Sequence, residues 1–184
     1  MDVTVEVNKN LIDFFNDYPT SIHGDDFMTR WAMYANTPLT EEVKQKLYPG
    51  LKYYLKGLSQ VDAVNLLLNY LQYGFPYGYD DEVWGYDRAF FAEETMYYPK
   101  SDCEDHAILF SRLVRDLVGL NVILVYYPGH LSTAVQFTDN VEGDYLSLNG
   151  RRFTVCDPTC IGAPAGYTHP DYDNQEAKVI LLKR

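Results

Sequence analysis

The change of hydrophobic period around Gly119 limits the possible folds more than any other feature of the chain. Upstream of it, apolar residues recur at steps of three and four, as on the buried face of a helix. Downstream, Asn121 to Tyr127 is an almost continuous apolar run, typical of a central strand. Helical sequence that comes first and strand sequence that follows predict an α+β fold, because a βαβ repeat would alternate the two.

Short strands with turn signals between them account for the sequence after Tyr127. Asn149-Gly150 has strand-like residues on both sides, which is the strongest short-range signal of a hairpin. The predicted strands are residues 121–127, 130–137, 145–148, 151–156 and 177–182. We expect an antiparallel sheet in which 130–137 and 151–156 are neighbours, so that the start of one lies beside the end of the other.

A helix is predicted immediately before the sheet. Ser101 and Glu104 have the spacing of a capping box, and Gly119 is suited to end the helix. Its buried stripe consists of Ala107, Phe110, Val114 and Leu117. Extended toward the N-terminus, the stripe reaches Cys103, which places a thiol in the first turn. Unsatisfied backbone N–H groups and the helix dipole favour the thiolate there.

Two further helices are predicted upstream from their N-terminal capping residues. Thr40 opens the first, which is interrupted near Pro49 and resumes through Leu55. Ser59 opens the second, which ends at Gly74. Both predictions follow from the same chemistry, since a hydroxyl group accepts a hydrogen bond from the free N–H groups of the first turn.

The chain divides into a predicted extension and a predicted core. Residues 1–58 begin with an alternating strand pattern at 3–7 and continue as a helical extension. Residues 59–184 form the core, and a chain of 184 residues accommodates both parts in one compact domain. Because the strand pattern starts abruptly, we also expect that the sequence is a piece of a longer, exported protein with other domains.

Charge and composition exclude several classes of partner. The formal net charge is −11, which disfavours binding to nucleic acid and to anionic membranes. No apolar run is long enough to span a bilayer, so we expect no membrane insertion. Three cysteines do not make a disulfide framework and leave the compartment open. A periplasmic location is expected if the full-length chain carries a leader peptide.

The excess negative charge is concentrated between residues 80 and 105, where nine acids face two bases. The acids are Asp80, Asp81, Glu82, Asp87, Glu93, Glu94, Asp102, Glu104 and Asp105. Eleven of the chain's 28 aromatic residues also lie between residues 70 and 98. The segment is either a solvated acidic loop or a cation site. Its aromatic side chains cover the core, form one wall of a cleft beside Cys103, or do both.

Three residues have the types and the expected placement of a catalytic triad. His130 opens one predicted strand and Asp157 follows the end of its neighbour, so both lie at the same edge of the sheet. A helix packed on the sheet can bring Cys103 to that edge. The thiol then has an imidazole to take its proton and a carboxylate to orient the imidazole. Taken singly, they are also explained as a buried cysteine, a turn histidine and a turn-opening aspartate.

Other residues compete for single roles in this arrangement. His106 lies one turn after Cys103 and is the alternative base, but no carboxylate in the sequence is placed to orient it. Its ordinary interpretation is a packed or surface histidine of the helix. The oxyanion needs a second donor besides the backbone N–H of Cys103, and Gln72 and Trp84 are candidates.

The same elements resemble the transglutaminase-like superfamily, and most closely the bacterial transglutaminase-like cysteine proteinases. The resemblance covers residues 60 to 165, roughly, and has three motifs. They are Asp102-Cys103-Glu104-Asp105 opening an apolar helix, Gly129-His130 opening a strand and Cys156-Asp157-Pro158-Thr159 closing another. It implies a papain/transglutaminase-like fold, with N-terminal helices and the nucleophile at a helix N-terminus packed on an antiparallel sheet. By position, it makes Cys103 the nucleophile, His130 the general base and Asp157 the orienting carboxylate.

The acids beside the thiol have two interpretations. In the first, Asp102, Glu104 and Asp105 point to water and cap the helix, with Glu104 and Asp105 on its solvent-facing side. In the second, the three hold calcium, a hard cation that accepts oxygen ligands in irregular geometry. The family resemblance implies the second, because some periplasmic relatives bind calcium through acids at these positions. The triad chemistry itself requires no cofactor.

The expected function is a thiol-dependent hydrolase, a cysteine peptidase or amidase that acts on a protein or peptide through an acyl-enzyme. An amine in place of water would turn the same chemistry into acyl transfer of the transglutaminase type, and the sequence does not separate the two. The alternative is a non-catalytic module that keeps the fold and binds peptide or glycan with its aromatic, acidic segment.

Overall fold

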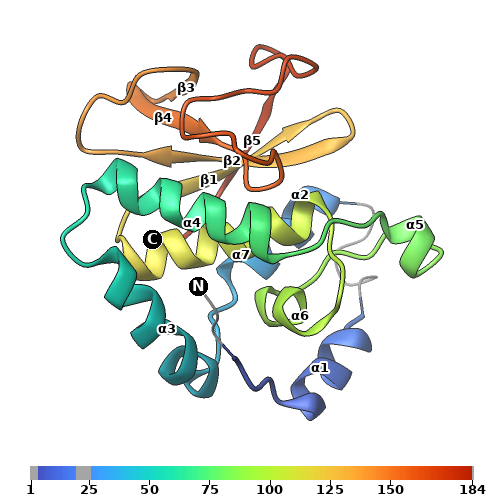
Figure 1. Cartoon of the computed structure of the whole chain (residues 1–184). Coiled ribbons are helices and arrows are strands. Elements are labelled where there is room, and N and C mark those ends of the chain that lie inside the picture. Colours follow the sequence, from blue (N-terminus) through green and yellow to red (C-terminus); the bar gives the residue numbers. More distant parts are fainter. Residues whose placement is uncertain (1–3, 20–25, 184) are drawn as a thin grey trace.

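The computed structural model describes residues 4–19 and 26–183, which form helices packed under an antiparallel sheet (Figure 1). The helices are α1 (Lys9–Asn16), α2 (Phe27–Asn36), α3 (Glu41–Leu55), α4 (Gln60–Gly74), α5 (Asp80–Val83), α6 (Ala92–Tyr97) and α7 (Cys103–Leu117). The strands are β1 (Asn121–Tyr127), β2 (His130–Gln136), β3 (Tyr145–Leu148), β4 (Arg151–Cys156) and β5 (Lys178–Leu181). Helices precede strands along the chain, so the predicted α+β class is confirmed.

The sheet has the order β3-β4-β2-β1-β5, and every neighbouring pair is antiparallel. Asn149 and Gly150 make the turn between β3 and β4 with φ of 51° and 74°, the positive values that a two-residue hairpin requires. β4 then returns beside β2, with Cys156 opposite Thr133. The predicted pairing of these two strands is confirmed, and it places the start of β2 beside the chain that leaves β4.

The N-cap of α7 is Asp102, so the predicted start at Ser101 is wrong by one residue. Ser101 is held in an extended bridge with Tyr77, which keeps its backbone out of the helix. Asp105 occupies the third helical position and accepts from the backbone N–H of Asp102 at 3.2 Å. The capping box is therefore acidic at both ends. At the other end, Gly119 has a φ of 76° and terminates the helix as predicted.

The upstream helices begin at the predicted caps. Thr40 accepts from the backbone N–H of Val43 at the start of α3, and Ser59 plays the same role for α4. The predicted interruption near Pro49 is wrong, because α3 runs through this proline. Proline removes a single N–H donor, and the burial of flanking residues such as Leu51 keeps the helix continuous.

The N-terminal residues join the core without the strand expected at their start. Residues 4–7 lie outside any helix or strand, so the strand predicted at 3–7 is wrong for them, and Val3 falls outside the described residues. Trp31 and Tyr34 of α2 belong to the same buried cluster as the apolar residues of α4, α7 and one face of the sheet. The division into 1–58 and 59–184 stays a prediction.

α7 lies between the sheet and the other helices (Figure 1) and contacts β1, β2, α2, α4 and α6. Eleven of its 15 residues are buried, including every residue of the first two turns. The helix is therefore enclosed on all sides at its N-terminal end and does not present the single buried stripe that the sequence indicates. The polar side chains there have little contact with water, so leaving one of them without a partner inside the protein is costly.

Candidate active site

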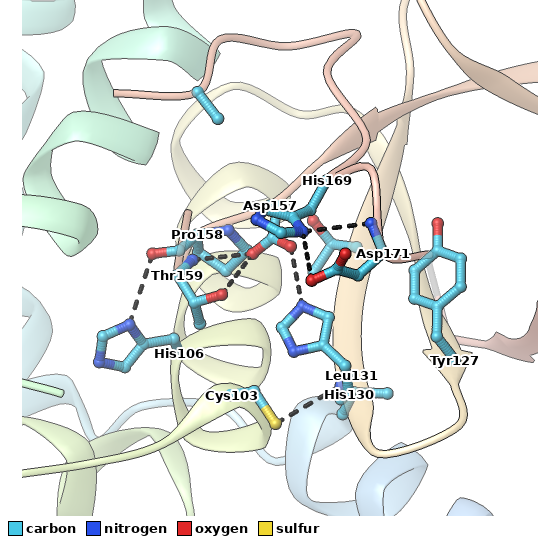
Figure 2. A network of polar contacts seen from close by, with 12 residues as sticks. Cys103, His106, Tyr127, His130, Leu131, Asp157, Pro158, Thr159, His169 and Asp171 are labelled. Carbon is cyan, nitrogen blue, oxygen red and sulfur yellow. Dashed lines mark hydrogen bonds and ion pairs between the residues drawn. The ribbon is translucent and has the colours of Figure 1, made fainter. Parts of the chain in front are cut away.

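His130 and Asp157 form a buried hydrogen-bonded pair at one edge of the sheet. The antiparallel pairing of β2 with β4 brings them together, and His130 Nε2 lies 2.8 Å from Asp157 Oδ2 (Figure 2). The second oxygen, Oδ1, accepts from the backbone N–H of Thr159 at 2.9 Å and from its hydroxyl at 2.6 Å. Burial alone would raise the pKa of Asp157, but His130 and Thr159 together bring it below its ordinary value. The carboxylate is thus ionised and fully bonded.

Cys103 is the first residue of α7 and its thiol lies beside the start of β2. The backbone N–H of Leu131 donates to Cys103 Sγ at 3.5 Å, directly after His130 in the chain. Figure 2 shows the imidazole of His130 between the carboxylate of Asp157 and the sulfur of Cys103. Because Asp157 takes Nε2, Nδ1 is the ring nitrogen left for a proton from the thiol. The structure therefore brings the three predicted residues together.

The thiol is surrounded by negative groups, which the sequence argument placed elsewhere. Glu104 and Asp105 were expected on the solvent-facing side of the helix, but they are 6% and 0% exposed, so this expectation is wrong. Glu104 Oε2 lies 3.2 Å from Cys103 Sγ. Burial, and then the charges of Glu104 and Asp102, raise the pKa of the Cys103 thiol. These effects outweigh the helix N-terminus, which by itself favours the thiolate.

The acids near the thiol crowd one another. Carboxylate oxygens of Asp80, Asp102 and Asp105 lie within 4.8 Å of one another, and so do those of Asp80, Asp87 and Glu104. Burial, followed by the charges of Asp105 and Glu104, raises the pKa of Asp102 to about 10. Burial is also the main reason why the pKa of Asp80 is raised to about 6. Asp102 Oδ1 is buried and has no hydrogen-bond partner among the described residues.

These acids do not all have the same task. Asp105 Oδ1 accepts from the backbone N–H of Phe90 at 2.7 Å, and Oδ2 accepts from Asp102, so this carboxylate ties the 88–91 segment to α7. Asp80 comes from the short helix α5 and joins both groups of acids, although sequence reasoning did not single it out. Its only signal in the sequence was the density of acids between residues 80 and 105. Of the three acids predicted to hold calcium, Asp102 and Glu104 each belong to a group of acids that includes Asp80, whereas both oxygens of Asp105 already accept hydrogen bonds.

A pocket of about 370 Å³ opens over the thiol and the imidazole. It is lined by the aromatic residues Phe27, Trp31, Tyr77, Tyr79 and Tyr126, by the acids Asp80, Asp81, Asp87, Asp102 and Glu104, and by Cys103, Gly129, His130 and Leu131. Tyr77 and Tyr79 come from the aromatic segment before α7 and form part of its wall. Other aromatics of that segment, such as Trp84 and Tyr98, surround the guanidinium of Arg88 and cover the core. The two interpretations of the segment thus hold for different residues.

His106 and Gln72 are occupied by the chain that follows β4, not by the pocket. His106 Nδ1 lies 3.4 Å from the carbonyl oxygen of Pro158 (Figure 2), and burial lowers the pKa of this histidine to about 4. Gln72 Nε2 donates to the carbonyl oxygens of Asp157 and Ala163 at 3.0 and 3.1 Å. Neither residue lines the pocket, and neither does Trp84. Gln72 and Trp84 are therefore not placed as oxyanion donors.

Comparisons with known proteins add no assignment to this geometry. No family model matches the chain, and a search of curated proteins finds no match. Within the described residues, no helix combines the length and apolar character needed to cross a bilayer. The three cysteines are unpaired. The features of the structure that bear on function are the arrangement of Cys103, His130 and Asp157 and the pocket above Cys103 and His130.

Proposed function

We propose that the protein is a thiol-dependent hydrolase, a cysteine peptidase or amidase on a papain/transglutaminase-like fold. The observation that carries the proposal is the buried 2.8 Å hydrogen bond between Asp157 and His130, a residue that lines the same pocket as Cys103. The buried Asp157 carboxylate is held by three hydrogen bonds, one from His130 and two from Thr159. A histidine oriented by a carboxylate next to a thiol is the arrangement that acyl transfer needs.

The reaction begins when Cys103 attacks the carbonyl carbon of a peptide or amide bond, while His130 takes the thiol proton. His130 then gives that proton to the departing amine as the C–N bond breaks, which leaves a thioester on Cys103. Water attacks the thioester, His130 takes its proton and returns it to the sulfur, and the carboxylic acid leaves. Asp157 stays ionised throughout and fixes the imidazole. In this proposal the backbone N–H of Cys103, at the helix N-terminus, donates to the oxyanion.

The acidic residues fit a calcium ion in addition to this chemistry. Asp80, Asp102 and Glu104 offer carboxylate oxygens within 4.8 Å of a neighbour, and Asp102 Oδ1 is an unpartnered acceptor in the interior. A divalent cation supplies positive charge where buried carboxylates otherwise hold protons or repel one another. Its role in the proposal is electrostatic and structural, and the triad residues carry every proton transfer.

A second candidate function is supported by the aromatic and acidic walls of the pocket and by the raised pKa of the Cys103 thiol. Both features suit a non-catalytic module that binds a peptide or a glycan. Aromatic rings stack on apolar and cationic groups, and carboxylates accept from their polar atoms. Under this alternative, His130 and Asp157 hold the pocket in shape and no bond is broken.

The test is turnover of a mixed library of internally quenched peptides, with release of fluorescence as the signal. The wild-type protein is compared with Cys103→Ser, each with millimolar calcium and with a chelator. Hydrolysis by the wild type that is lost in Cys103→Ser supports the hydrolase. A primary amine is added in a parallel assay. If the amine is found in the acyl product, the protein carries out acyl transfer and not hydrolysis. Binding of peptides without turnover, equal in both proteins, contradicts the hydrolase and favours the binding module.

A further inference from the structure

A tyrosine outside the triad lies flat against the imidazole of His130. Tyr172 belongs to the segment between β4 and β5, and its ring is parallel to that of His130, with centroids 4.6 Å apart and an interplanar angle of 3°. Asp157 contacts the same imidazole at its edge, through Nε2. The imidazole is therefore held at one edge by a hydrogen bond and over one face by a phenol ring.

Tyr172 is itself supported by Tyr127, whose ring also lies near that of His130, with centroids 6.4 Å apart, and by contacts along its own chain segment. The ring of Tyr172 stacks on Tyr127, with centroids 5.1 Å apart and an angle of 21°. Tyr127 is 1% exposed, and its hydroxyl donates to Asn174 Oδ1 at 2.7 Å. The backbone N–H of Tyr172 donates to the carbonyl oxygen of His169 at 3.0 Å, which closes a turn. The ring plane presented to His130 is thus fixed by the end of β1 and by a turn of its own segment.

We propose that Tyr172 is a positioning residue that acts through His130, an inference that rests on the proposed function. One hydrogen bond leaves an imidazole free to rotate about the bond axis, and such rotation would swing Nδ1 away from Cys103. A parallel ring at 4.6 Å removes that freedom and shields the hydrogen bond to Asp157 from water on one side. Packing alone does not require Tyr172, because it is only half-buried and lies at the margin of its apolar cluster.

The phenol ring also acts on charge. In each step of the proposed reaction, His130 passes through the imidazolium form, and the electron-rich face of a tyrosine attracts a cation held over it. This attraction is stronger for the charged imidazolium than for the neutral ring, so it favours the stage at which the thiolate attacks. Phenylalanine has a similar face and should replace tyrosine, whereas leucine fills space without a π system.

The experiment measures the rate at which iodoacetamide alkylates Cys103 at pH 7, followed by mass spectrometry of the Cys103 peptide. Tyr172→Leu and Tyr172→Phe are made in the wild-type chain and in the His130→Ala chain. Tyr167→Leu is the matched control, because Tyr167 is a partly exposed tyrosine of the same segment that does not stack on His130. Melting temperatures of all variants are recorded so that a folding defect is recognised.

We expect Tyr172→Leu to lower the alkylation rate of Cys103 about tenfold. Tyr172→Phe and Tyr167→Leu should keep a rate near that of the wild type. In the His130→Ala chain, Tyr172→Leu should have no further effect. The same fall in both backgrounds would overturn the inference, since Tyr172 would then act independently of His130. A wild-type rate in Tyr172→Leu would also overturn it. If His130→Ala alone leaves the alkylation rate unchanged, His130 does not activate the thiol and the proposed function is wrong. This outcome is distinct from a failure of the Tyr172 inference, in which His130→Ala lowers the rate and Tyr172→Leu does not act through His130.

Discussion

The two sides of Cys103 treat buried negative charge in opposite ways. On the sheet side, both oxygens of Asp157 are bonded, to His130 and to Thr159, and its pKa lies below the ordinary value. On the helix side, the pKa values of Asp80 and Asp102 are raised to about 6 and about 10, and Asp102 Oδ1 has no partner in the described chain. Asp157 is stabilised as a carboxylate by its own hydrogen bonds. Asp80 and Asp102, which we call the helix-side acids, need protons or a cation to be stabilised.

The difference is one of hydrogen-bond partners: both oxygens of Asp157 have them, whereas Asp102 Oδ1 has none among the described residues. A buried charge is tolerated when partners of opposite charge or suitable donors surround it, and it is costly when it meets only other acids. The sheet side therefore suits a permanent catalytic partner for His130. The helix side suits a site whose charge state changes, because added cations and changes of pH act on groups that have few partners of their own.

The largest effect is expected on the sheet side, from the triad itself. Replacing Cys103, His130 or Asp157 by alanine should lower turnover by about 10⁴-fold or more, because each residue is needed for the same proton transfers. The double variant Cys103→Ala, His130→Ala should lose little more than either single variant, since the residues act as a unit. Turnover of the peptide library and circular dichroism of each variant provide the measurement.

The matched control for the triad is His106→Gln. His106 is buried and lies against the chain after β4, but it does not line the pocket. This variant should therefore keep most of the turnover once its stability has been checked. Loss of activity in His106→Gln together with an active His130→Ala would reverse the assignment of the base.

The next effect is expected on the helix side, from calcium. At a calcium concentration about 100 times the Kd, the melting temperature should rise by about 5–10 °C, because the ion stabilises the folded state by mass action. Glu104→Gln should abolish most of this response, since it removes one carboxylate oxygen of the site. Differential scanning fluorimetry with calcium, magnesium and chelator measures it. If the melting temperature responds to neither the ions nor the chelator, the calcium prediction is wrong, and these acids only cap the helix or lie buried without a metal.

A smaller effect is expected from the amide that supports the sheet side. Gln72→Leu leaves the carbonyl oxygens of Asp157 and Ala163 without their buried donor and should lower the free energy of unfolding by about 1–3 kcal/mol. Asn65→Leu is its control, because Asn65 lies on the same helix and bonds to the backbone N–H of Ala165, but in a half-buried position. Urea denaturation should show the smaller loss for Asn65→Leu. Equal losses would mean that Gln72 has no special role near Asp157.

The two sides should also respond to pH with opposite signs. Raised carboxyl pKa values mean that the folded chain binds protons more tightly than the unfolded chain, so its stability falls as the pH rises. The contribution of Asp80 is lost between about pH 4 and pH 6, and that of Asp102 between about pH 4 and pH 10. The lowered pKa of Asp157 contributes stability above about pH 4 that is lost as the pH falls. Without calcium, melting temperatures should therefore decline from mildly acidic to alkaline pH. A maximum near pH 8 would contradict this balance.

How much the sequence predicted also differs between the two sides. Strand pairing follows from apolar runs and turn residues, so the start of β2 and the end of β4 were correctly placed together, and with them His130 and Asp157. The burial of Glu104 and Asp105 did not follow, because a periodicity argument treats charged residues as exposed. That burial depends on the chain segment before α7, whose short helices α5 and α6 carry no sustained period. Local patterns do not encode which distant segment covers a helix end.

The smallest expected effect is on the reactivity of the Cys103 thiol, which lies between the sheet side and the helix side. The pKa of Cys103 is raised by burial first and by the charge of Glu104 next, so Glu104→Gln should speed alkylation of Cys103 between pH 7 and 8 in calcium-free buffer. Glu82→Gln is the control, because Glu82 is an exposed acid of α5 that does not line the pocket. Calcium should speed the wild type and leave Glu104→Gln unchanged, since both changes relieve the same charge. If Glu104→Gln slows alkylation instead, Glu104 helps to activate the thiol, and the helix side belongs to the catalytic chemistry.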